Sequence, residues 1–194
     1  DERGQKCARV QLVDLLGLPQ NTAAGFVSGT STASLCGLVA GRDYLLRKNG
    51  WDVSSRGLFG APEIRVVLGA GAHSTVYKAL SILGLGKDRL IQVPTDEQGR
   101  MRADLLPELD SNTLLILQAG NVNSGAFDPF VEICSKARAA DAWVHIVSAF
   151  GLWADASPRL AAIRASSTAS GAVSQTPRNG APPAAASSAA RWAG

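Results

Sequence analysis

Short continuous apolar runs alternate with longer segments in which apolar residues recur at helical spacing. Four runs have the length of buried strands: "IRVVL" from Ile64, "LIQV" from Leu90, "LLILQ" from Leu114 and "WVHIV" from Trp143. Runs of four to eight apolar residues, bounded by turn residues, are typical of strands that are covered on both faces. The pattern therefore predicts four buried strands.

Helical spacing marks the segments between and before these runs. Val10, Val13 and Leu16 predict a short helix that ends at Gly17, and a second helix is predicted around Leu35 to Leu46. A third contains Val76, Ala79, Leu80 and Leu83 and ends at Gly84. In "FDPFVEICSKARAA", Asp128 is expected to cap a fourth helix with Pro129 at its first position.

This alternation predicts an α/β fold with a mostly parallel sheet and helices on both faces. Ligands of such sheets bind beyond the carboxyl ends of the strands. Candidate chemistry is therefore expected in the loops that follow the strands, and three loops there carry suitable residues.

The composition changes near residue 160. From Ala161 to Gly194 the chain is mainly Ala, Ser, Pro, Gly and Arg, and no acidic residue follows Asp155. Such a segment has too few large apolar side chains to form a core. We expect residues 1–160 to form part of one globular domain and residues 161–194 to form a disordered, low-complexity tail.

Composition and charge narrow the function classes. No apolar run approaches the roughly 20 residues of a membrane span, and no signal segment opens the chain. We therefore expect a cytoplasmic protein that does not associate with a membrane. Cys7, Cys36 and Cys134 fit neither a disulfide framework nor a zinc site, and no metal is expected. The net charge of +3 is scattered, which argues against nucleic acid as a partner.

The first candidate loop, "GFVSGTSTAS" from Gly25 to Ser34, leads directly into a predicted helix. Free N–H groups at a helix N-terminus, together with Ser and Thr hydroxyls, can bind a phosphate. The same residues are also favoured as ordinary helix caps, and alone the loop favours that simpler interpretation.

The second candidate loop lies in "VVLGAGAHSTVYKAL", where a strand, a glycine-rich turn and a helix follow one another. Gly69 and Gly71 suit a dinucleotide fingerprint, but Ser74 stands where its third glycine belongs. The acidic residue expected about 20 positions later could only be Asp96, which comes late and after a proline. His73 in this turn could stack on a planar ligand, although a lone histidine is usually structural.

The third candidate loop, "QAGNVNSGAFDP", runs from Gln118 to Pro129 after a strand. Asn121, Asn123 and Ser124 could orient a polar ligand, and a plain turn explains them nearly as well. His145 lies in the neighbouring strand. Hydroxyl, imidazole and amide groups are thus expected at one edge of the sheet.

The segments, in their order, resemble the pyridoxal-phosphate (PLP) dependent group II amino acid decarboxylases, which include the aromatic amino acid and glutamate decarboxylases. The resemblance runs from about Leu12 to Leu160 and depends on "GFVSG", "GAHSTVYKALSILGLG", "VPTDEQGRM", "AGNVNSGAFDP", "WVH" and "AFGLWA". It implies part of the large domain of the fold-type I PLP-dependent transferases, a lyase activity on an amino acid substrate, and a homodimer in the full-length relatives.

The resemblance also implies site residues for pyridoxal 5'-phosphate. Thr30 and Ser31 would hold the phosphate and His73 would stack on the ring. Asn121 and Asn123 would lie near the cofactor. The remaining two positions are His145, where the family strand carries its histidine, and Ala149, which would pack close to the ring.

The chain departs from the family pattern at two places. The family strand reads His, apolar, Asp, small, Ala, whereas here Val147 takes the place of the aspartate that pairs with the ring nitrogen. The family lysine that forms the Schiff base lies downstream, and no lysine follows Lys136 here, so no catalytic residue is identified.

Two interpretations of different classes remain. The favoured one is a fragment of a decarboxylase that is inactive alone, and the second is a nonenzymatic remnant that binds PLP weakly or not at all. A dinucleotide-binding oxidoreductase is a distant third. A frame-shifted copy and a degenerate paralogue would look the same in this sequence.

Overall fold

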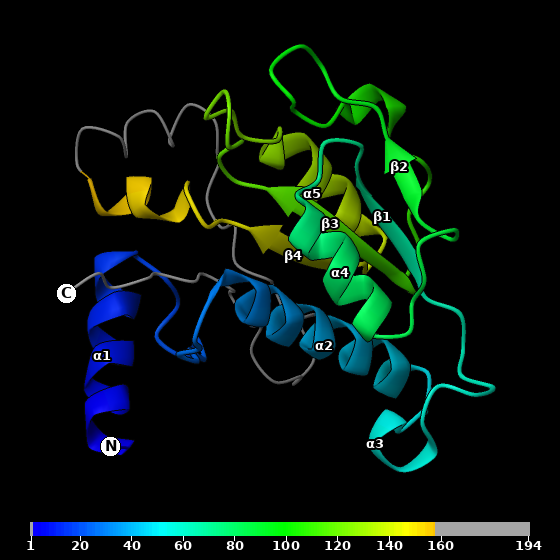
Figure 1. Ribbon diagram of the computed structural model, residues 1–194, viewed down its shortest axis with the longest axis horizontal. Helices are drawn as coiled ribbons and strands as arrows, with labels where there is room; N and C mark the ends of the chain where they lie inside the picture. The colour runs from blue at the N-terminus through cyan, green and yellow to red at the C-terminus, as the bar shows by residue number, and fades with distance from the viewer. Residues whose placement is uncertain (1, 158–194) are drawn as a thin grey trace.

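Four parallel strands form the centre of the computed structural model, which describes residues 2–157 (Figure 1). Their order across the sheet is β2-β1-β3-β4. The strands are β1 (Arg65–Gly69), β2 (Ile91–Val93), β3 (Thr113–Gln118) and β4 (Trp143–Val147). The sequence predicted all four, and their apolar runs are buried because helices cover both faces of the sheet.

The register of the sheet aligns the carboxyl ends of its strands. Leu114 of β3 pairs with Trp143 of β4, and Gln118 at the end of β3 pairs with Val147 at the end of β4. Gly69 at the end of β1 pairs with Val93 at the end of β2. The loops that follow the four strands therefore start from one edge of the sheet.

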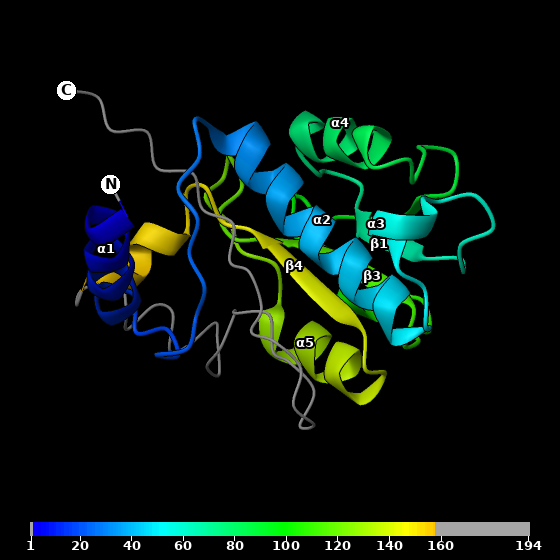
Figure 2. The same cartoon turned by 90° about the horizontal axis from the view of Figure 1, so that it is seen from below.

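Two helices cover one face of the sheet and a third covers the other. Figure 2 shows α2 (Thr30–Lys48) and α4 (Ser74–Ile82) above the strands and α5 (Phe130–Ala139) below them. Leu38 of α2 and Leu80 of α4 pack into one cluster with Leu114 of β3. Ile133 of α5 packs into a second cluster on the opposite face. This arrangement confirms the predicted α/β class.

The remaining elements are not part of the three layers. They are α1 (Glu2–Leu15), α3 (Val53–Arg56) and the short 3₁₀ helices η1 (Ala103–Leu105) and η2 (Leu152–Ala156). Ala103 of η1 nevertheless packs into the second core cluster. Figures 1 and 2 both place α1 beside η2, away from the body of the sheet. Gly17 follows α1 with a φ of 59°, a left-handed conformation in which glycine ends a helix without strain.

The predicted tail at residues 161–194 lies outside the described residues, and the domain boundary near residue 160 stays a prediction. Within residues 2–157, no helix combines the length and the apolar character needed to cross a membrane.

Thiol reactivity is expected to distinguish Cys134 from the other two cysteines. Cys134 lies on α5 against the second core cluster, and burial raises its pKa from 9.0 to about 11, whereas Cys7 and Cys36 are exposed. Because the thiolate reacts, this shift lowers the reactive fraction of Cys134 by roughly 100-fold near neutral pH. A chromogenic disulfide reagent should give two fast thiols and one slow thiol.

The variant Cys134→Ala is the matched control, because it should remove the slow phase and keep both fast ones. Three thiols reacting at one rate in the folded wild type would show that α5 does not pack as described.

Candidate functional site

A pocket opens at the carboxyl edge of the sheet, on the face covered by α2 and α4. Its empty space, open solvent included, amounts to about 310 Å³. Twelve residues line it: Gly69, Gly71, Ala72, His73, Val76, Thr95, Gly99, Ile116, Leu117, Gln118, Asp128 and Val147. Apolar side chains from β3, β4 and α4 therefore lie beside a polar group formed by His73, Thr95, Gln118 and Asp128.

Small residues keep the β1 side of this pocket open. A Cβ added at Gly71 would contact Thr95 Cγ2 at 3.8 Å, and one added at Gly69 would contact Met101 and Thr95, each at 3.7 Å. A longer side chain at either position would therefore extend against the turn that follows β2. The glycine-rich turn thus lets that second turn come close to the end of β1.

His73 is the N-terminal cap of α4. Its backbone is extended, and its Nδ1 accepts a hydrogen bond from the Thr75 N–H at 3.3 Å and lies 2.9 Å from Thr75 Oγ1. The imidazole thus replaces the usual Ser or Asp at this position. It is exposed and lines the pocket.

Asp128 does not cap α5, so that prediction is wrong. Pro129 is the N-cap residue, and no side chain caps the helix. The Asp128 carboxylate instead accepts hydrogen bonds from the Met101 N–H and the Gln118 N–H, each at 2.7 Å. These partners are 27 and 10 residues away along the chain, which is why local sequence rules pointed to the helix instead.

Burial raises the pKa of Asp128 above its ordinary value, while the hydrogen bonds from Met101 and Gln118 oppose that change. The side chain is 5% exposed. Asp128 is thus a buried carboxyl group at the wall of the pocket, and both of its oxygens accept hydrogen bonds from backbone N–H groups.

The turn after β2 is closed by a different carboxylate. Asp96 Oδ1 accepts the N–H groups of Gln98 and Arg100, each at 2.9 Å, and Asp96 Oδ2 pairs with Arg100 Nε at 2.7 Å. The hydrogen bond from the Arg100 N–H is the main cause of a lowered Asp96 pKa. Both oxygens are engaged within the turn, so Asp96 is poorly placed to bind the ribose of a dinucleotide.

Asn121 joins the turn after β3 to the turn after β2. Its Oδ1 accepts the N–H groups of Asn123 at 2.9 Å and Ser124 at 3.2 Å, and Ser124 Oγ donates to the Gln98 carbonyl at 2.6 Å. Its amide lies so close to Gly99 that a Cβ there would stand 2.5 Å from Asn121 Nδ2. The side-chain oxygen of Asn121 is therefore used by hydrogen bonds within its own turn. Neither Asn121 nor Asn123 lines the pocket.

Thr30 and Ser31 form the first turn of α2. The N-cap is Gly29, and no side chain caps this helix, so the first N–H groups of α2 have no capping side chain. Both residues are exposed and neither lines the pocket. Because α2 and α4 pack in the same core cluster, Thr30 and His73 begin two helices on the same face of the sheet.

The polar residue inside β4 is fully enclosed. His145 is 2% exposed and pairs with Ile116 of β3 in register, and burial lowers its pKa to about 4. It lies two residues before Val147, which reaches the pocket whereas His145 does not. Ala149 is half-buried in the loop that follows.

Of the seven site residues predicted from the sequence, His73 alone lines this pocket. Thr95, Gly99, Gln118 and Asp128 line the pocket but were not among the predicted site residues, although the last two lie in the third candidate loop. The sequence did contain a signal for Asp128. A carboxylate in a loop that follows a strand can contribute to a binding site as well as cap the next helix.

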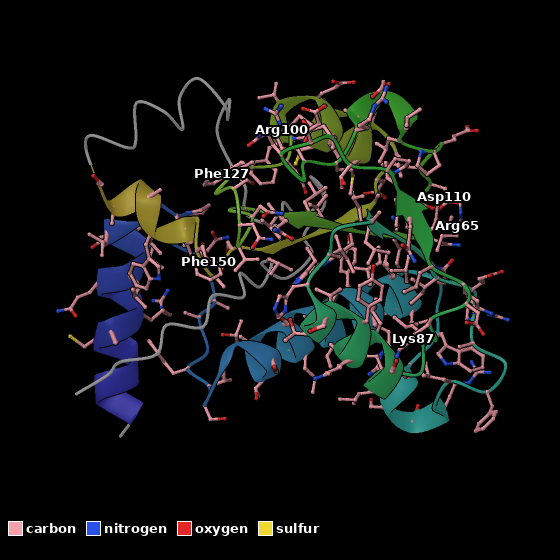
Figure 3. All side chains as sticks on the ribbon, turned by 45° about the horizontal axis from the view of Figure 1, so that its top comes forward. Arg65, Lys87, Arg100, Asp110, Phe127 and Phe150 are labelled. Carbon is pink, nitrogen blue, oxygen red and sulfur yellow. The ribbon has the colours of Figure 1, made fainter. Side chains whose placement is uncertain are left out.

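The described lysine side chains lie away from this pocket. Lys48 contacts Asp141 and the Ser111 carbonyl, and Lys136 contacts Glu132 and the Ala103 carbonyl. Lys78 and Lys87 are exposed, and neither lines the pocket. Figure 3 shows Lys87 well apart from Phe127 and Phe150, which follow β3 and β4.

No group of three or more His, Cys, Asp or Glu side chains within residues 2–157 could hold a metal ion. The polar side chains that line the pocket are an imidazole, a carboxyl, an amide and a hydroxyl group.

Comparisons with known proteins place the chain among decarboxylases, although no family model matches it. It is 30% identical to L-2,4-diaminobutyrate decarboxylase of Rhizobium meliloti over 149 residues, which cover 72% of this chain and 28% of that protein. These shares leave most of the relative's length outside the comparison.

Solved structures agree with this similarity. The glutamate decarboxylase domain of a Vibrio parahaemolyticus protein superposes with a TM-score of 0.67 at 25% identity, over 79% of this chain and 36% of that one. Oryza sativa TDC, solved with PLP and tryptamine, gives a TM-score of 0.61 at 26% identity, over 77% and 33%. The chain therefore belongs to the group II PLP-dependent amino acid decarboxylase family and spans about a third of the length of its full-length relatives.

Proposed function

We propose that these 194 residues form part of the large domain of a PLP-dependent amino acid carboxy-lyase and do not decarboxylate an amino acid by themselves. The observation that carries the proposal is the pocket at the carboxyl edge of the sheet. Val147 lines it where the family has a carboxylate, and none of the described lysines does.

The pocket offers apolar contacts to a pyridine ring but no carboxylate at position 147 for its nitrogen. Val147, Val76 and Ile116 offer an apolar surface, and the exposed His73 ring stands beside it. A protonated ring nitrogen against Val147 would lack a charged partner, and an unpaired cation at an apolar surface loses its proton. The residues present therefore do not fit a working cofactor site, and no reaction step through PLP follows from them.

The parts of the site that do suit PLP are a helix N-terminus and a ring face. We propose that Thr30, Ser31 and the first N–H groups of α2 bind the cofactor phosphate, since such a terminus attracts anions. Asn121, Asn123, His145 and Ala149 remain proposed cofactor neighbours that do not line the pocket.

Weak PLP binding without catalysis is the alternative for this chain, and the same pocket supports it. The dinucleotide alternative has less support, because Asp96 is engaged within its own turn. Melting temperatures measured with PLP and with NAD separate the two ligands, and we expect stabilisation by PLP alone.

Restoring the carboxylate with Val147→Asp is expected to strengthen PLP binding without giving decarboxylation. A charged partner for the ring nitrogen contributes roughly 1.5–3 kcal/mol when well placed. A carboxylate cannot replace the lysine that holds the cofactor covalently. Because the carboxylate and the lysine act together in catalysis, restoring the carboxylate alone should add little activity. The assay measures carbon dioxide release from a panel of amino acids and the visible absorbance of bound PLP.

Val147→Asn is the matched control, since it adds a similar polar side chain without a charge. Borohydride reduction followed by peptide mapping reports any lysine bound to PLP. Stoichiometric labelling of one lysine, together with turnover, would refute the proposal.

A further inference from the structure

We propose that Asp128 is a positioning residue that fixes the width of the pocket by holding two of its walls together. One wall is the turn from Thr95 to Met101 after β2, and the other is the carboxyl end of β3. This role is independent of the proposed function, because it needs no cofactor and no reaction.

Each carboxylate oxygen of Asp128 accepts a hydrogen bond from a different wall of the pocket. Oδ1 accepts the Met101 N–H and Oδ2 accepts the Gln118 N–H, each at 2.7 Å. Met101 forms a bridge with Thr95, and both Thr95 and Gln118 line the pocket. A single side chain therefore sets the separation between the turn and the strand end.

The backbone around Asp128 holds the carboxylate in place. Its own N–H donates to the Gln118 carbonyl at 3.1 Å, and the neighbouring Phe127 forms a bridge with Ala119. The Asp128 side chain is buried, so water competes little for its oxygens. No ion pair within residues 2–157 includes Asp128, so backbone N–H groups carry its polar interactions.

The outer tip of the turn has separate attachments. Ser124 Oγ donates to the Gln98 carbonyl, and the Asn121 amide packs against Gly99. Loss of the Asp128 contacts should therefore loosen the inner part of the turn, next to the pocket, while the tip stays attached. A residue needed merely for global stability would affect all of these positions together.

The test compares Asp128→Asn with Asp104→Asn by amide hydrogen exchange of the full chain. An asparagine oxygen can accept one N–H, but its amino group faces the other donor, so one contact is lost. Asp104 is exposed and pairs with Arg102, which makes it a matched carboxylate without a buried role.

In Asp128→Asn, exchange is expected to rise by roughly tenfold or more at whichever of Met101 and Gln118 then faces the amino group, as for a lost buried hydrogen bond. Val67 and Leu115 in the core should exchange as in the wild type. Asp104→Asn should leave Met101 and Gln118 unchanged. Equal acceleration at all four positions, or none at Met101 and Gln118, would overturn the proposal.

The His73 ring supplies a second readout at the pocket itself. The chain contains two histidines, so the His73 ring signal can be assigned by nuclear magnetic resonance with a His73→Asn sample. The signal should shift in Asp128→Asn and stay in place in Asp104→Asn. An unchanged His73 signal in Asp128→Asn would show that the contact does not shape the pocket.

The wild type provides a measurement that needs no variant. As the pH falls, the amide signals of Met101 and Gln118 should move together with one midpoint, as Asp128 takes up a proton. Asp96 from the turn, Cys134 from α5 and His73 at the start of α4 are the other titratable groups near it. Separate midpoints for the two amides, or no movement, would overturn the proposal even if Asp128→Asn does not fold.

Discussion

Acidification from pH 6.5 to about 4 is expected to lower the free energy of unfolding by about 3 kcal/mol through His145. Burial lowers the pKa of His145 from 6.5 to about 4 in the folded chain. In this pH range the unfolded chain binds a proton at His145 and the folded chain does not. The unfolded state is therefore stabilised as the pH falls, and the stability is fully present above pH 6.5.

Other groups titrate in the same experiment, so the prediction concerns a difference between two proteins. Asp128 acts in the opposite direction, because a raised carboxyl pKa means that protonation relieves a cost of burial. The variant His145→Phe keeps a ring in the core and removes the titration. Denaturant unfolding at several pH values should give a shallower pH dependence for this variant than for the wild type.

The control is His73→Asn, which removes the exposed histidine and retains a residue suited to an N-cap. It tests whether an altered pH dependence belongs to the buried ring or follows from the removal of any histidine. If His145→Phe and the wild type lose stability in parallel, His145 is either not buried or not neutral in the folded chain.

Enlarging Gly41 is expected to destabilise the fold by about 3 kcal/mol or more for Gly41→Val, with Gly41→Ala intermediate. Gly41 lies in the middle of α2, where a Cβ would stand 2.7 Å from Trp143 Nε1 and 3.0 Å from Leu114 Cδ1. Replacing glycine by alanine in a free helix gains about 1 kcal/mol, so any loss here reports the contact with the sheet. Thermal or denaturant unfolding measures the effect.

The Trp143 ring has little room to move away. It lies on β4 in the core cluster that includes α2 residues, and Tyr44 packs on it with the ring centroids 5.0 Å apart. Trp143 Nε1 is buried without a hydrogen-bond partner among the described residues, because the helix backbone at Gly41 covers it. Adding Trp143→Phe to Gly41→Ala should therefore recover part of the lost stability.

Gly25→Ala is the control, because a Cβ there would meet no atom within 4 Å. It should leave stability nearly unchanged. Equal effects of Gly41→Ala and Gly25→Ala would mean that α2 does not pack this closely on the sheet.

The fold could be predicted from the sequence because its signals are local. Each strand is a continuous apolar run, and Gly84 follows α4 with a φ of 73°, as its place in the sequence indicated. The elements that the sequence missed are short: α3, η1 and η2 contain too few residues for an apolar repeat to be visible. The Asp52 carboxylate caps α3 by accepting the Ser54 N–H, but one such local contact does not by itself predict a four-residue helix.

The candidate site could be predicted less well, because most of its contacts join distant segments. The sequence indicated His73 and the substitution at Val147, since both lie at strand ends in recognisable motifs. It left open whether Asn121 would orient a ligand or serve its own turn, and the structure shows its carbonyl oxygen accepting N–H groups of that turn.

The sequence by itself determined the strand and helix order, the family, the loss of the carboxylate at Val147 and the absence of a lysine after Lys136. The tertiary structure alone decided which groups meet at the pocket. It placed Asp128 between Met101 and Gln118 and left His145 buried two residues short of the opening. The physical reason is that a side chain's partners are chosen by packing across the sheet, which brings together residues that no local pattern relates.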